Sequence, residues 1–109
     1  MMSTPERAIY QALTHLGIEF IFQSSMLGGR EIRGGLIADF QVPSLSLVIR
    51  CQGEYFHSRS DTKARDELQK IALETSGWRV IDIDATDALR NALFYIQEAI
   101  RGISHARRL

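Results

Sequence analysis

The sequence predicts an α/β fold with a mixed β-sheet flanked by helices, in the order α-β-β-β-α-β-α. Apolar residues recur at helical spacing in three segments, and four shorter segments are rich in β-branched and aromatic residues. The chain has 109 residues and is 45% hydrophobic, which suffices for one core. We therefore expect a single domain over residues 1–109.

A first helix is expected to begin at Ser3, because Ser3 and Glu6 have capping-box spacing and a proline lies between them. Gly17 is a plausible stop for this helix. Residues 19–23 then have the composition of a strand. The apolar residues of the helix recur every three or four positions: Ile9, Leu13 and Leu16.

Two glycine pairs bracket the charged residues 30–33, and this pattern suits either a flexible connection or a distorted hairpin. Beyond them, residues 36–40 and 45–51 form two apolar segments of strand length. Only the short segment 41–44 separates these two, so we expect them to be antiparallel neighbours at the buried centre of the sheet.

Ser60 or Asp61 is expected to cap a second helix that ends before Gly77. Residues 78–83 form the fourth strand, with the Trp78 side chain in the core. The intervening helix makes a crossover, which predicts that the third and fourth strands are parallel. The apolar face of this helix is expected to comprise Leu68, Ile71, Ala72 and Thr75.

A last helix is expected to begin at Thr86 or Asp87. One face of it forms a long apolar stripe: Leu89, Leu93, Ile96, Ile100 and Ile103. Phe94 and Tyr95 beside the stripe offer a surface for a homodimer, although a stripe that is entirely core explains the pattern equally well.

Charge and cysteine content restrict the function classes. Thirteen basic and thirteen acidic residues cancel, so attraction to a polyanion must come from the distribution of charge. The single cysteine, Cys51, excludes an internal disulfide and a cysteine-based zinc cluster, and fits a reducing, intracellular compartment. No apolar run is long enough to cross a bilayer, and the N-terminus does not resemble a secretion signal.

The chemistry-bearing residues lie in the middle of the chain. An acidic residue within residues 37–40 is followed by a hydrophobic strand that ends in a glycine, and then by Tyr55-Phe56-His57. Arg65-Asp66 and the run 77–80, Gly-Trp-Arg-Val, come later. This pattern, from residue 6 to about 83, resembles the very-short-patch-repair (Vsr-like) branch of the PD-(D/E)XK nucleases. The resemblance implies a restriction-endonuclease-like fold.

Related phage homing endonucleases share a pattern called EDxHD. This chain has the corresponding residues in the same order: Glu6, Asp39, His57 and Asp66. The resemblance implies Mg²⁺-dependent cleavage of DNA, with Mn²⁺ as a substitute for Mg²⁺.

A role follows for each of these residues. Asp39 is the natural ligand for a hard cation, and the main-chain carbonyl of Cys51 offers a second oxygen. Glu6 is expected to bind a metal-coordinated water or a second ion. His57 is expected to transfer a proton, and Asp66 to fix its tautomer by a hydrogen bond.

Two positions depart from the commoner family motif, which has glutamate and lysine where this chain has Arg50 and Gln52. Gln52 remains able to contact water or phosphate as a neutral amide. Arg50 either binds a phosphate or repels the metal, and in the second case it marks a chain that has kept the fold and lost catalysis.

Further basic residues are expected to contact DNA phosphates: Arg30, Arg33, Arg59, Lys63 and Arg65. A solvated charged face is the alternative, because acidic residues are interspersed. The sequence thus favours a DNA endonuclease over an inactive DNA-binding module or a protein-interaction domain. No motif defines which DNA structure or sequence would be cut. The sequence is compatible with a homodimer and equally with a partner protein that selects the cleavage site.

Overall fold

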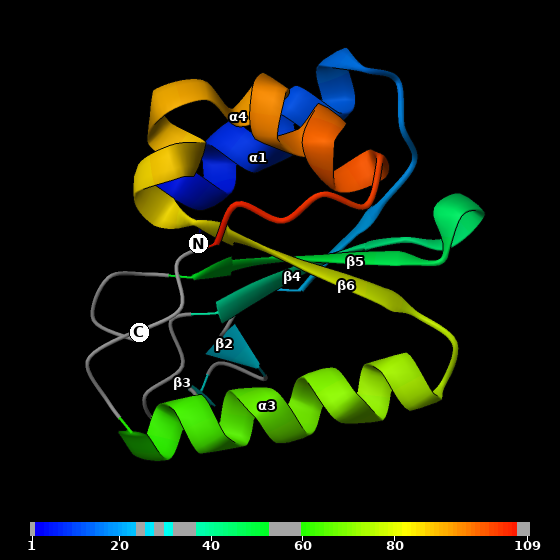
Figure 1. The fold of residues 1–109 in the computed structure, drawn as a ribbon. Helices are drawn as coiled ribbons and strands as arrows, with labels where there is room; N and C mark the ends of the chain where they lie inside the picture. Colours follow the sequence, from blue (N-terminus) through cyan, green and yellow to red (C-terminus); the bar gives the residue numbers. More distant parts are fainter. Residues whose placement is uncertain (1, 24–25, 28–29, 32–36, 53–59, 107–109) are drawn as a thin grey trace.

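A computed structural model describes the backbone of residues 2–23, 26–27, 30–31, 37–52 and 60–106, and the side chains of residues 2–22, 40–52, 64 and 67–106. Figure 1 shows helices on both sides of a central sheet. The elements follow the chain in this order: α1 (Thr4–His15), β1 (Ile21–Gln23), β2 (Met26–Leu27), β3 (Arg30–Glu31), β4 (Ile37–Val42), the 3₁₀ turn η1 (Pro43–Leu45), β5 (Leu47–Gln52), α3 (Ser60–Thr75), β6 (Arg79–Asp84) and α4 (Ala85–Ile100).

The central sheet has four strands in the order β1-β4-β5-β6. β4 is antiparallel to both β1 and β5, whereas β5 and β6 are parallel. The α/β class, the antiparallel pairing of β4 with β5, and the parallel pairing that follows the α3 crossover are therefore confirmed. β4 and β5 are the central strands, as the sequence predicts.

The region before β4 contains a separate two-stranded sheet. β2 and β3 are antiparallel, with Met26 opposite Glu31 and Leu27 opposite Arg30. Of the two alternatives for this region, the short hairpin agrees with this pairing. The glycine pairs themselves lie outside the described residues.

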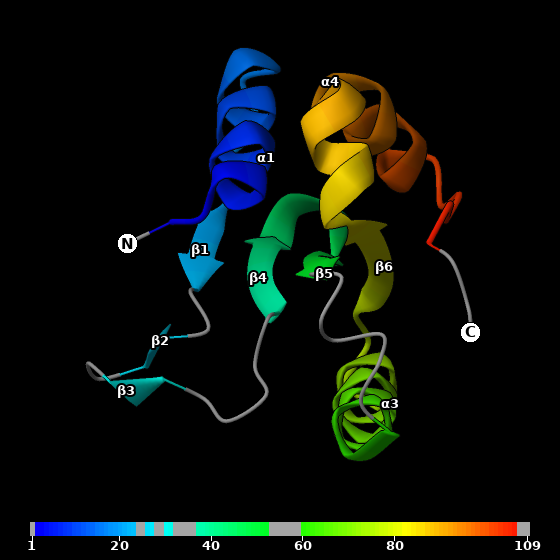
Figure 2. The same cartoon turned by 90° about the vertical axis from the view of Figure 1, so that its left-hand side faces the viewer.

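Helices α1 and α4 cover one face of the sheet and α3 lies on the other (Figures 1 and 2). The hydrophobic core fills the space between the sheet and the α1–α4 layer. Its fully buried side chains come from both layers: Ile9, Leu13, Phe40, Val42, Leu47, Ile49 and Ile96. Among the described helices, none combines the length and the apolar character that a membrane span requires.

The predicted capping box of α1 is confirmed. Ser3 Oγ accepts a hydrogen bond from the Glu6 amide at 3.3 Å, and the Ser3 amide donates to Glu6 Oε1 at 2.8 Å. Both first-turn amides are thereby satisfied, which stabilises the start of the helix. Gly17, with a φ of 70°, follows the helix in the left-handed conformation that favours glycine.

Both later helices begin earlier than predicted. α3 already includes Ser60 and Asp61, so neither residue is its cap. α4 begins at Ala85, directly after β6, with Asp84 at the N-cap position.

The predicted apolar face of α3 is not part of the core, and this prediction was wrong. Leu68 and Ile71 are 69% and 54% exposed. Leu73 is half-buried, and the exposed Gln69 contacts the sheet through its Oε1, which accepts a hydrogen bond from Arg50. The other two residues of the predicted face, Ala72 and Thr75, are also exposed.

The predicted stripe of α4 holds only in its second half. Asn91 has non-helical backbone angles, φ −164° and ψ 75°, which kink the helix. Leu89, before the kink, is 55% exposed, whereas Ile96, beyond it, is fully buried. Ile103 lies past the end of the helix. The kink breaks the 3.6-residue phase, so a single periodic stripe cannot describe the whole segment.

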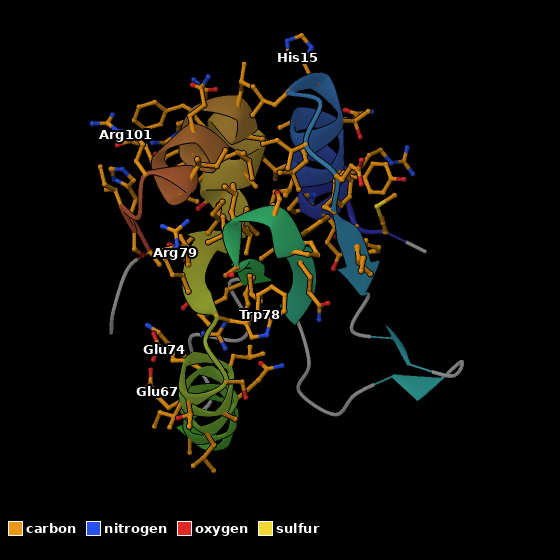
Figure 3. The ribbon with its side chains drawn as sticks, turned by 90° about the vertical axis from the view of Figure 1, so that its right-hand side faces the viewer. His15, Glu67, Glu74, Trp78, Arg79 and Arg101 are labelled. Atoms are coloured by element: carbon orange, nitrogen blue, oxygen red, sulfur yellow. The ribbon has the colours of Figure 1, made fainter. Side chains whose placement is uncertain are left out.

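Trp78, expected in the core, is only partly buried and directly precedes β6. Figure 3 shows it on the α3 side of the sheet. Its amide donates to the carbonyl of Leu73 at 3.0 Å, and the next amide, that of Arg79, donates to the carbonyl of Ser46 at 2.7 Å. These bonds join the end of α3 to the start of both parallel strands.

Candidate functional site

One end of the sheet gathers the termini of several elements. β5 and β6 end there at Gln52 and Asp84, which are paired in the register, and α1 and α4 both begin there (Figure 1). Gln52 and Asp84 are each 4% exposed, and Glu6 from α1 is 7% exposed. Glu6 Oε1 already accepts the Ser3 amide of the capping box. Buried carboxylate and amide groups from three elements nevertheless gather at this end of the sheet, which makes it the candidate site.

Cys51 connects these groups electrostatically. Burial, together with the negative charges of Glu6 and Asp84, raises the pKa of its thiol to about 12. The thiol therefore stays protonated at neutral pH, which agrees with the interpretation of Cys51 as a small buried hydrophobe. Because their charges act on the same sulfur, Glu6 and Asp84 lie close to this end of β5 although one belongs to α1 and the other to β6.

Arg50 occupies the centre of the sheet and is fully buried. Its Nε and Nη2 donate to Asp82 Oδ1 and Oδ2 at 2.7 and 2.9 Å, and its Nη1 donates to Gln69 Oε1 at 3.3 Å. The two carboxylate contacts form a bidentate pair across the parallel strands. The guanidinium is thus buried and engaged by protein groups, and the phosphate-binding role of Arg50 stays a prediction.

Register places Asp39 in the same row as this pair. Asp39 on β4 is opposite Arg50, and Arg50 is opposite Asp82 on β6. The next row is Ala38, Cys51 and Ile83, and the row after it consists of Ile37, Gln52 and Asp84. The predicted metal ligand Asp39 thus lies two rows from Gln52 and Asp84 of the candidate site, on the strand next to that of Cys51.

The other predicted residues are described in part or not at all. The structure gives the backbone of Arg30 in β3 and of Lys63, Arg65 and Asp66 in α3, without their side chains. Arg33, His57 and Arg59 lie outside the described residues. Whether His57 and Asp66 meet Asp39 therefore stays a prediction.

The donor chemistry of the candidate site fits a hard divalent cation. Glu6 and Asp84 contribute carboxylate oxygens and Gln52 an amide oxygen, while the protonated thiol of Cys51 is no competing soft ligand. Among the residues whose side chains are described, no three His, Cys, Asp or Glu residues are close enough together to hold a metal ion.

Sequence reasoning missed Asp82, Gln69 and Asp84. A signal for Asp82 was present, because the alternation Ile81-Asp82-Ile83-Asp84 places a carboxylate on every second residue of a strand. An arginine in the neighbouring apolar strand required a partner. The register between the two strands was needed to match them.

Comparison with known proteins gives no relative: no family model, no curated protein and no solved structure matches this chain.

Proposed function

We propose that the chain is a metal-dependent endodeoxyribonuclease of the Vsr-like, EDxHD type, which hydrolyses DNA phosphodiester bonds. The order of helices and strands and the mixed sheet support this proposal, because they agree with the restriction-endonuclease-like core that the sequence resemblance implies. The observation that carries it is the gathering of buried Glu6, Gln52 and Asp84 at one end of the sheet, with Gln52 and Asp84 two rows from Asp39.

In this proposal Asp39 binds Mg²⁺, the Cys51 carbonyl offers a second oxygen, and Glu6 orders a coordinated water. The ion, when bound, acts as a Lewis acid on the phosphate. His57 transfers a proton to or from the reacting oxygens, and Asp66 orients its imidazole.

Gln52 contributes a neutral amide beside the phosphate. The negative charge of the DNA backbone is met by basic residues around the site, because DNA binding without a net protein charge depends on local clusters. The residues proposed for this are Arg30, Arg33, Arg59, Lys63 and Arg65.

A plasmid-nicking assay with Mg²⁺ or Mn²⁺ tests the proposal. We expect wild-type cleavage, loss of cleavage in Asp39→Asn, and a drop of about 10²–10⁴-fold in the single-turnover rate of His57→Ala with DNA affinity retained. Glu19→Gln is the matched control, because it removes one carboxylate from an exposed position in the connection between α1 and β1. Absence of cleavage with either metal, or an unchanged rate in Asp39→Asn, would overturn the proposal.

A second candidate function is a non-catalytic DNA-binding module. The buried ion pair of Arg50 with Asp82 favours it, since a buried cation stands where the commoner motif has a metal-binding glutamate. This alternative expects DNA binding that weakens with salt and is the same with and without Mg²⁺.

A further inference from the structure

A row of charged residues crosses the centre of the sheet next to the proposed metal site. Asp39, Arg50 and Asp82 are successive partners on β4, β5 and β6. Arg50 is fully buried, and Asp82, with its side chain 14% exposed, accepts two of its hydrogen bonds. A permanent positive charge therefore lies at the strand position opposite Asp39.

Such a charge opposes a second cation nearby. Arginine stays protonated in proteins, and charges within several ångströms interact strongly in a low-dielectric interior. A divalent ion bound by Asp39 would be repelled by Arg50 unless another charge offsets the guanidinium. Asp82 supplies that charge, in a bidentate geometry that fixes it beside Arg50.

We infer that Asp82 is a positioning residue that sets the metal affinity of the site by neutralising Arg50 beside Asp39. This inference rests on the proposed function, because it takes Asp39 as a metal ligand. It also explains how an arginine at position 50 is compatible with a metal-dependent active site.

A charge-compensating role and a purely structural role of the Arg50–Asp82 pair predict different changes in metal affinity. If the pair only stabilised the fold, removal of either partner would weaken metal binding or leave it unchanged. Charge compensation requires opposite effects: metal binding weakens without Asp82 and strengthens without Arg50, and it returns to the wild-type level when both charges are removed.

Mn²⁺ binding by isothermal titration calorimetry tests this with three variants. We expect Asp82→Asn to weaken Mn²⁺ binding about tenfold or more, since one charge is lost at short range in a medium of effective dielectric constant about 20. Arg50→Gln should tighten binding, and the double variant Arg50→Gln with Asp82→Asn should lie within about threefold of the wild type.

Circular dichroism selects the variants that fold, because loss of one partner of a buried ion pair is destabilising. If Asp82→Asn fails to fold, the Mn²⁺ affinities of Arg50→Gln and of the double variant still test the inference. Both variants lack the guanidinium, so neither buries it without its partner. Asp39→Asn must abolish binding, and Glu19→Gln, with the same change of net charge as Asp82→Asn, must leave it unchanged.

Weaker binding in Arg50→Gln, or equal affinity in all folded variants, overturns the inference while the proposed function stands. A wild-type protein that binds no Mn²⁺ overturns both.

Discussion

Arg50 is the largest fully buried side chain of the described part of the chain. Charged residues are almost never buried completely unless they are paired, and the pair with Asp82 meets that requirement. A buried ion pair contributes little net stability, but removal of one partner costs about 3–5 kcal/mol because the other charge remains unpaired. At the residue scale, the pair links β5 to β6, and the hydrogen bond from Arg50 to Gln69 links β5 to α3.

Cys51 predicts a pH dependence of stability. Its pKa is about 12 in the folded protein against an ordinary value of 9.0, so the folded state holds the thiol proton more tightly. The resulting stabilisation is complete below pH 9.0 and is lost as the pH rises toward 12. We expect the free energy of unfolding to fall between pH 9 and 10.5 by up to about 1.4 kcal/mol per pH unit from this group.

Urea denaturation of the wild type and of Cys51→Ala at each pH measures this effect. Other groups titrate in both proteins, so the difference between the two isolates the thiol. Parallel stability curves for the two proteins would show that the thiol has no such role.

At the element scale, α4 consists of two helical segments. Asn91 leaves the helical conformation, and its Oδ1 accepts a hydrogen bond from the Phe94 amide at 3.2 Å. This is the N-cap-to-N3 contact that starts a helix. The kink thus has a local cause, and it explains why Leu89 and Ile96 do not share one buried face.

Asn91→Ala should destabilise the protein by about 1 kcal/mol, because the second segment loses its cap. Asn91→Asp should be close to the wild type, since a carboxylate oxygen can accept the same hydrogen bond. Chemical denaturation of both variants provides the measurement, and equal stability of Asn91→Ala and the wild type would exclude the capping role.

At the scale of the whole molecule, the two faces of the sheet differ. The face toward α1 and α4 carries the hydrophobic core, whereas Arg50 reaches α3 through a polar contact and the apolar side of α3 is exposed. Figure 3 shows Glu67 and Glu74 on the flank of this helix. Self-association through α4 stays a prediction: Phe94 is 43% exposed, while Ala99 is fully buried and belongs to the core.

This asymmetry predicts unequal costs for similar substitutions. Ile96→Ala should destabilise the protein by about 2–5 kcal/mol, because it opens a cavity in the core. Leu68→Ala, at a site 69% exposed, should cost less than about 0.5 kcal/mol. Thermal unfolding of the two variants compares them directly, and a large loss in Leu68→Ala would mean that α3 is packed through that face.

The sequence by itself determined the features that local chemistry dictates. The capping box at Ser3, the glycine after α1, the apolar strands β4 and β5, and the parallel β5–β6 pair all follow from residue types and spacings within short segments. The candidate site residues also came from the sequence, by resemblance, and their roles remain predictions.

Only the tertiary structure decided which groups meet. Arg50 and Asp82 are 32 residues apart, and their pairing depends on the register of two parallel strands, which a shift of one residue would reverse. The direction of the apolar side of α3 depends on what the sheet presents to it. An amphipathic pattern reveals that a helix has two faces, but the partner that it packs against decides which face is buried.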